Sequence, residues 1–170
     1  IKSVNAPIVN NFNCNLKTAN DFKLKCDGEN IRVIECLDGQ LITNELFVAS
    51  FSIDGFAESN VEQDVLKIAV VNRYKDAPIA IAFIKNIGLT QGAIASCVAH
   101  DCHNIVVVGT NDEDICNAVN LIIKAKGGIS LANGNEELVL KVVELAKTHK
   151  REIATPKEAR EILKIQGEEK

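Results

Sequence analysis

Residues 92–111 read GAIASCVAHDCHNIVVVGTN, and this stretch predicts the centre of the fold. Two apolar runs of strand length, 93–99 and 104–109, follow one another here. Between them lies a polar segment that holds His100 and His103, two of the three histidines of the chain. Ionisable side chains between two buried strands cost free energy unless they are paired or used. We therefore expect the functional part of the chain at this segment.

Further runs of strand length precede this stretch. We expect strands at 31–39, 66–74 and 79–85, with strand-like sequence from 40 to 55 and a polar loop at 57–64. In each strand alternate side chains lie on opposite faces, so one apolar set faces a core. The first half of the chain is therefore predicted to be mainly sheet.

A helical period begins after residue 110. Thr110 to Glu113 reads as a capping box, in which Thr110 caps the helix and Glu113 bonds back to it. Apolar residues then recur every three or four positions, and residues 126–128, Lys-Gly-Gly, end the pattern. A short strand at 128–132 is expected to follow.

Beyond an Asn133-Gly134 turn, two more helices are predicted. Residues 136–148 carry an amphipathic stripe, and residues 156–165 begin with a proline in the first helical position. Strands thus dominate before residue 110 and helices after it. The predicted class is α/β of the α+β type. It has a mixed sheet of about five to seven strands, with two to three helices concentrated in the C-terminal third.

Three segments follow from these patterns. Residues 1–30 are rich in asparagine without periodicity and are predicted to be an extended connector. Residues 31–135 form the main domain, and residues 136–170 a helical tail of uncertain origin. Because the chain contains no methionine, we expect it to be a piece of a longer product.

Composition narrows the function classes. The chain has 46% apolar residues and a net charge of −4, with no basic stripe, which argues against nucleic-acid binding. No apolar run reaches membrane-spanning length. Six cysteines without a tight framework suggest reduced thiols and a cytoplasmic protein.

Three interpretations of the polar segment stay open on residue types alone. Cys97, His100, Cys102 and His103 include soft metal ligands, but four ligands from seven residues would strain a tetrahedron. A cysteine and a histidine could instead form a nucleophile pair. The third interpretation is a turn in which His100 and Asp101 bond to the backbone.

Longer strings resemble a known family. LKIAVVNRY (66–74), GLTQGAIASCVAHDCHNIVVVGTNDED (88–114), IRVIECLDGQLIT (31–43) and VNAPIVNNFNCN (4–15) are similar to the C-terminal region of adenine deaminases, in the amidohydrolase superfamily. The resemblance covers about residues 1–140. This family usually has serine or threonine at Cys97 and serine at Cys102, which weakens the cysteine and metal interpretations.

The resemblance implies hydrolysis of adenine to hypoxanthine and ammonia, with manganese or iron in the full-length enzyme. The metal ligands of such enzymes lie on a (β/α)8 barrel and begin with an H-x-H pair, which this chain lacks. We therefore expect no metal on this chain, little activity from it alone, a barrel domain of the same protein as its partner, and a homo-oligomer. The alternative is a non-catalytic oligomerisation or interaction module.

The resemblance also suggests site residues at the barrel mouth or domain interface. The catalytic candidates are His100, Asp101 and His103. The candidates for substrate binding or interface contact are Asn104, Asn72, Arg73 and Ser96. From about residue 136 the chain departs from this family, and REIATPKEAREIL (151–163) is similar to the C-terminal helices of 3-keto-5-aminohexanoate (β-keto acid) cleavage enzymes. A fragment related to those enzymes is a further alternative.

Overall fold

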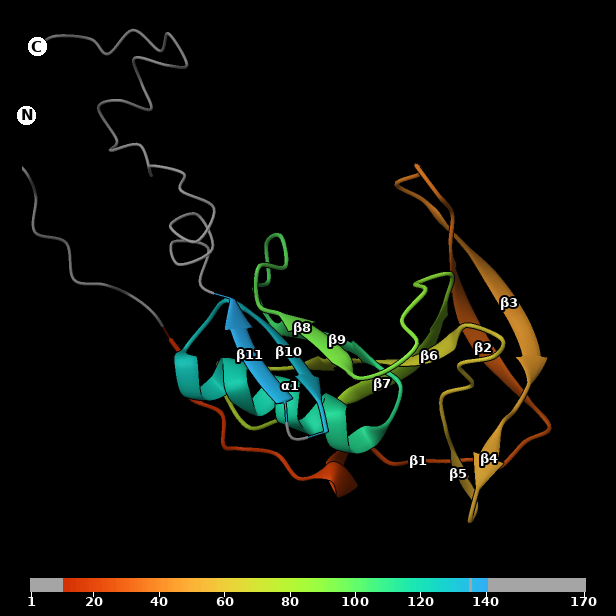
Figure 1. Ribbon diagram of the computed structural model, residues 1–170, viewed down its shortest axis with the longest axis horizontal. Helices are drawn as coiled ribbons and strands as arrows, with labels where there is room; N and C mark the ends of the chain where they lie inside the picture. Colours follow the sequence, from red (N-terminus) through yellow and green to blue (C-terminus); the bar gives the residue numbers. More distant parts are fainter. Residues whose placement is uncertain (1–10, 135, 141–170) are drawn as a thin grey trace, which may run out of the picture. The chain divides into compact units, whose positions relative to one another are not determined.

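The computed structural model describes residues 11–134 and 136–140, which form a mixed β-sheet with one α-helix, α1 (Asp112–Ala125) (Figure 1). The sheet has eight strands. In spatial order they are β11 (Glu136–Leu140), β10 (Ile129–Asn133), β8 (Ala93–Ser96), β9 (Ile105–Gly109), β6 (Val65–Val71), β7 (Ala80–Lys85), β2 (Asn30–Cys36) and β3 (Thr43–Ala49). All neighbours are antiparallel except β2 and β7, which are parallel. The α+β class is confirmed, with one strand more than predicted.

A second, small sheet lies beside the first. It consists of β1 (Leu24–Lys25), β5 (Phe56–Ala57) and β4 (Ser52–Ile53), in that spatial order. Val33 of β2 and Phe83 of β7 pack with Ala57 and Val65 in a core of their own. The small sheet therefore extends the hydrophobic interior beneath the β2–β7 part of the main sheet.

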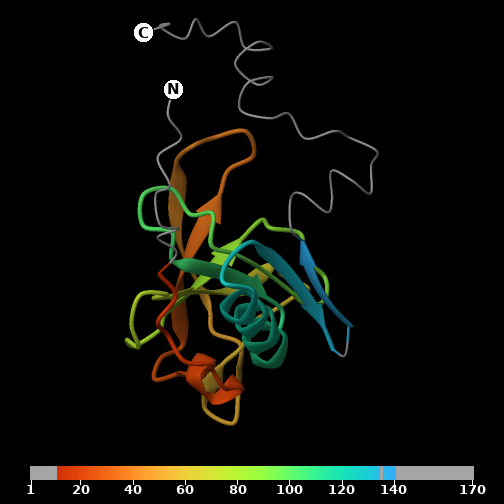
Figure 2. The ribbon, with the colours of Figure 1, turned by 90° about the vertical axis from the view of Figure 1, so that its left-hand side faces the viewer.

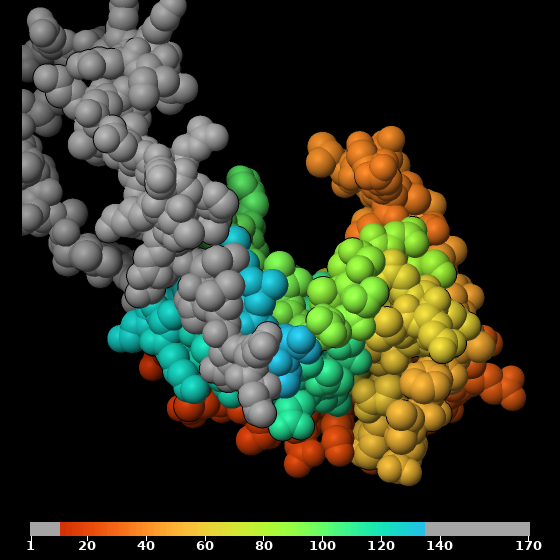
Figure 3. Space-filling view, in the orientation of Figure 1, coloured from red at the N-terminus to blue at the C-terminus, as the bar shows by residue number. Residues whose placement is uncertain are grey.

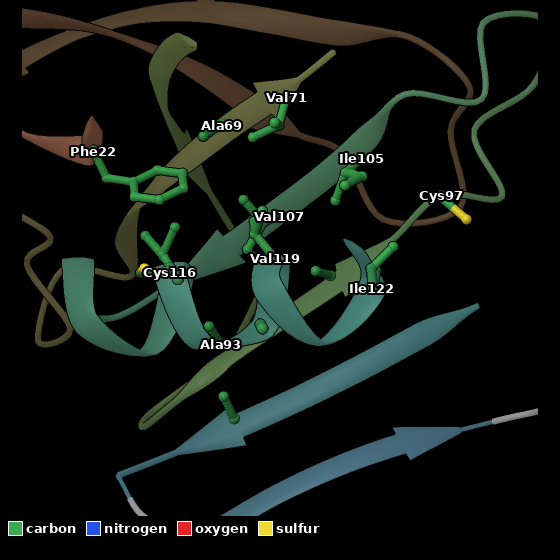
Figure 4. Packing of buried hydrophobic residues seen from close by; sticks show 14 residues of the cluster. Phe22, Ala69, Val71, Ala93, Cys97, Ile105, Val107, Cys116, Val119 and Ile122 are labelled. Atoms are coloured by element: carbon green, nitrogen blue, oxygen red, sulfur yellow. The ribbon is translucent and has the colours of Figure 1, made fainter. Parts of the chain in front are cut away.

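The larger core lies between α1 and one face of the main sheet. Figure 2 shows α1 nearly end-on against that face, where it contacts β8, β9 and β10. A 3-10 helix, η1 (Ala19–Phe22), adds the fully buried ring of Phe22. The buried side chains of this core are Phe22, Ala69, Val71, Ala93, Ala95, Cys97, Ile105, Val107, Ile115, Cys116, Ala118, Val119, Ile122 and Ala132 (Figure 4). The predicted helical stripe and its cover of one sheet face are thus confirmed.

The start of α1 differs from its prediction by one residue. Asn111, not Thr110, is the N-cap, and its side chain accepts a hydrogen bond from the Asp114 amide at 2.8 Å. The amide and hydroxyl of Thr110 instead donate to the Gly92 carbonyl, at 2.9 and 3.1 Å. Thr110 is drawn into the sheet because β8 and β9 pair up to Ala93 and Gly109. The predicted helix end is confirmed, with Lys126 in the left-handed conformation.

The helix predicted over 136–148 is wrong for residues 136–140. These residues form β11, which pairs antiparallel with β10 from Asn133↔Glu136 to Ile129↔Leu140. The turn at Gly134, where φ is +59°, reverses the chain into a hairpin. Leu138 fits both a helical stripe with Val142 and Leu145 and a strand period of two with Leu140, so the sequence is compatible with either element. Residues 141–148 and the helix predicted at 156–165 lie outside the described residues.

The other predicted strands are confirmed with small shifts at their ends. The polar segment 57–64 is mainly turn, as expected. Residues 19–25, which fall in the predicted connector, carry η1 and β1. No helix among the described residues is long and apolar enough to cross a membrane.

Candidate functional site

The polar segment singled out in the sequence is the loop between β8 and β9, residues 97–104, called the histidine loop below. It meets the end of β6, because Val71 of β6 pairs with Ile105, the first residue of β9. The Arg73 amide lies 3.4 Å from the Asn104 side-chain oxygen, to which it donates. The fold thus brings the histidine loop together with the segment after β6 that carries Asn72 and Arg73.

The backbone of the histidine loop is tightly turned. Asp101 and His103 have positive φ values of 66° and 49°, a conformation that is uncommon for residues other than glycine. The His103 amide donates to the Ala99 carbonyl at 2.9 Å, which closes the turn. Non-glycine residues held in this region cluster at functional sites.

The ionisable side chains of the loop face solvent. The side chains of His100 and Asp101 are 96% and 90% exposed, and His100 Nδ1 lies 3.1 Å from Asp101 Oδ1. A contact this exposed contributes little to stability. The side chain of His103 is also exposed and makes no hydrogen bond with the described part of the chain. The segment is a turn, as the third interpretation has it, but among the described residues the side chains of His100 and Asp101 contact each other and not the backbone.

Tyr74 anchors the histidine loop through its hydroxyl group. Its hydroxyl donates to the Cys102 carbonyl at 2.9 Å. The Arg73 Nη2 group donates in turn to this hydroxyl at 3.2 Å. Tyr74, the single tyrosine of the sequence, belongs to the strand end that carries Asn72 and Arg73 but was not among the candidate site residues.

Arg73 is held between two aromatic rings. Its guanidinium carbon lies 4.9 Å from the centre of the Phe12 ring and 4.8 Å from that of Tyr74. Such contacts orient a guanidinium group without neutralising its charge. Its buried Nε atom has no hydrogen-bond partner among the described residues. Nothing in the sequence pattern linked Phe12 to Arg73, because 61 residues separate them.

Asn72 and Ser96 shape the backbone. The Asn72 side-chain oxygen accepts from the amides of Tyr74 and Lys75 at 2.9 and 3.2 Å, an Asx-type turn. The Ser96 hydroxyl accepts from the Val98 amide at 3.1 Å. Both side chains thus already have partners within the domain, and their predicted contact with substrate or an interface stays a prediction.

The two cysteines of the histidine loop differ in their exposure to solvent. Cys97 is buried, and its sulfur accepts from the Gly128 amide at 3.2 Å. Cys102 is exposed. Within residues 11–134 and 136–140, no three histidine, cysteine, aspartate or glutamate side chains lie close enough together to hold a metal ion. The geometry therefore does not favour a metal site or a Cys–His pair in this loop.

A buried charged cluster lies at the opposite end of β6. Lys67 is 1% exposed, and its Nζ lies 2.5 Å from Asp112 and 3.5 Å from Glu58. Burial raises the pKa of Glu58 above its ordinary value, against the lowering effect of Lys67. Asp112 is also one of three acidic residues in the first turn of α1, where a negative charge complements the helix dipole. Since Lys67 pairs with Gly109 at the far end of β9 from the histidine loop, this cluster is separate from the candidate site.

Comparison with known proteins supports one family. The model of the adenine deaminase C-terminal domain matches residues 40–147. Adenine deaminases of Borreliella afzelii and Borreliella burgdorferi are 46% and 44% identical over 79% and 84% of this chain. That of Methanosarcina mazei is 48% identical over 69% of it.

These relatives are much longer than the matched region. The chain covers 25% of the Borreliella afzelii protein and 22% of the Methanosarcina mazei protein, so it spans about a quarter of the curated relatives it matches. The family match also reaches residue 147, past the expected end near 140. Residues 136–147 therefore fall within this family, while the tail resemblance beyond them stays a prediction.

Proposed function

The chain belongs to the family of adenine deaminase C-terminal domains, and from this premise we propose that it is such a domain of an adenine deaminase. In this proposal the whole enzyme hydrolyses adenine, so that water replaces the amino group and hypoxanthine and ammonia leave. A metal, manganese or iron, would be held by the catalytic barrel of the same polypeptide and would there supply the activation of water. The described residues of this chain do not fit a metal ion, so none of them is proposed as a ligand of that metal.

The observation that carries the proposal is the histidine loop. A tightly turned backbone presents His100 and Asp101 almost fully to solvent. Exposed polar residues on a loop fixed by a rigid scaffold are typical of binding and catalytic positions.

Each candidate residue has a proposed part. His100, Asp101 and His103 contact the substrate or the barrel mouth, where imidazole and carboxylate groups exchange protons and accept bonds from an amino group. The other candidates act from the base of the loop. They are Asn104, Asn72, Arg73 and Ser96, whose contacts hold the loop on the strand ends.

The test uses a whole enzyme in which this chain replaces the matching quarter of the Borreliella burgdorferi adenine deaminase, called the chimera below. We expect Asp101→Ala and His100→Ala to lower kcat for ammonia release about 100-fold, the usual size for loss of a proton-transferring group. Glu62→Ala is the matched control, because Glu62 is an exposed acid just before β6, at the end of the strand away from the loop.

Full turnover in His100→Ala, Asp101→Ala and His103→Ala would contradict a role of the loop in the reaction. A folded chimera that binds metal but releases no ammonia from adenine would contradict the assignment to adenine deaminase. Circular dichroism and thermal unfolding of every variant establish that the loss of activity is not a loss of fold.

A further inference from the structure

The main sheet has a second face, opposite α1, whose side chains are buried at Leu66 and Ile84 but mostly half-buried or exposed over the rest of the described strands. We call it the open face. One row of apolar side chains crosses it over five strands. The members of this row, each paired with the next, are Leu131, Ile94, Val108, Ile68 and Ala82.

A second row lies two residues further along the strands. Its members are Ile129, Ser96, Val106, Val70 and Ala80. Of these two rows only Ser96 has a polar side chain. A sheet with one face in water normally alternates apolar and polar residues, whereas apolar residues on both faces are typical of a sheet covered on both sides. The sequence of these strands is therefore that of a sheet with a second cover.

The side chains on the open face are more exposed than those on the face that packs against α1. On the α1 side Ala93, Ala95 and Val107 are at most 3% exposed. On the open face Ile94 is 40% exposed, and Val106 and Val108 are only half-buried. The rows are thus a partly exposed apolar surface, and apolar surface that exceeds the scattered exposed residues of a typical monomer marks an interaction site.

Two projections flank the open face. One is the histidine loop, and the other is the β2–β3 hairpin, whose tip carries the exposed side chains of Leu41 and Ile42. Figure 3 shows the two projections, green and orange, on either side of a hollow. Phe47 of β3 is 70% exposed and lies opposite Arg32 of β2, on the side of the hairpin away from buried Val33.

We propose that the open face docks on an apolar surface of the catalytic barrel of the same polypeptide, an inference that rests on the proposed function. Two observations select this occupant. The curated relatives carry about three quarters of their length outside the matched region, which supplies the large body to be covered. The histidine loop rises from the same face (Figure 1), so docking here brings His100 to the barrel. A second copy of the chain seated on this face would lie between His100 and the barrel.

Hydroxyl-radical footprinting of the chain alone and of the chimera tests this docking directly. We expect oxidation of Ile94 to fall at least five-fold in the chimera. Oxidation of Ile53 is expected to stay unchanged, because Ile53 is 54% exposed on the small sheet. Equal oxidation of Ile94 in both proteins would overturn the proposal. Protection of Ile94 in the chain alone that grows with concentration would assign the face to a second copy and also overturn it.

A pair of substitutions gives an independent readout. Ile94→Lys is expected to leave the unfolding of the chain alone nearly unchanged but to lower the unfolding temperature of the chimera, because it places a charge in an apolar interface. Ile53→Lys is expected to change neither. An unfolding temperature of the chimera that is insensitive to Ile94→Lys would contradict the docking. Since neither readout uses ammonia release, failure of the docking proposal and failure of the proposed activity are distinguishable.

Discussion

Lys67 Nζ lies 2.5 Å from Asp112 Oδ1 in the interior of the protein, where the lysine side chain is 1% exposed. The pair joins β6 to the first turn of α1 through two residues that are 45 positions apart in the chain. The Ser59 hydroxyl accepts from the Lys67 amide at 2.8 Å and donates to the Gly109 carbonyl at 2.9 Å. This network therefore fixes where the helix begins relative to the sheet.

We expect Asp112→Asn to lower the free energy of unfolding by about 3 kcal/mol, because removing one partner leaves a buried charge poorly compensated. Urea unfolding measures the change. Glu113→Gln is the matched control, since its carboxylate is exposed in the same helical turn. A change in Asp112→Asn no larger than that in the control would show that the pair does not stabilise the fold.

Glu58 gives the network a pH dependence of defined sign. Burial raises the pKa of the Glu58 carboxyl above its ordinary 4.5, so the folded chain binds this proton more tightly than the unfolded chain. Its contribution to stability is complete below about pH 4.5 and is lost as the pH rises through the raised pKa. Glu58→Gln, which cannot ionise, should therefore gain stability relative to the original chain over this range. Urea unfolding of both proteins at successive pH values tests this. If the free energy of unfolding changes with pH in parallel for the two proteins, the prediction is contradicted.

Gly109 is required by a close approach between α1 and the sheet. A Cβ atom there would lie 2.5 Å from Ile115 Cγ1 and 2.7 Å from Ala93 Cβ. We expect Gly109→Ala to lower the free energy of unfolding by about 1–3 kcal/mol through overpacking. Gly28→Ala is the control, because its Cβ would meet only an ordinary contact at 3.7 Å. Equal thermal unfolding of the two variants would contradict this packing.

Tyr74→Phe removes the hydroxyl that anchors the histidine loop and keeps the ring beneath Arg73. We expect a loss of about 1 kcal/mol or less, as for one exposed hydrogen bond, and faster amide exchange at His103. Hydrogen-exchange mass spectrometry of the loop measures this, with Lys75→Ala as the exposed neighbour control. Unchanged exchange at His103 would mean that the loop holds its shape without the anchor.

The strands and α1 were predictable because their apolar periods agree with the burial that the fold provides. The period around Ile115 and Val119 admits only a helix, and its inward face is the buried one. Residues 136–140 fit the period of a strand as well as that of a helix, and they form a strand because they pair with β10. Propensity is a weak guide where a neighbouring strand is available to pair.

The order of residues was enough to predict the α+β class, the position of the histidine loop between two strands and the resemblance that the family match then confirmed. What each polar residue touches became visible only in the folded chain. The tertiary structure placed Tyr74 beneath Cys102, Phe12 against Arg73, and Lys67 in a buried ion pair. The physical reason is that period and turn chemistry are local properties of the chain. Contacts between residues tens of positions apart depend instead on how the strands pair across the sheet.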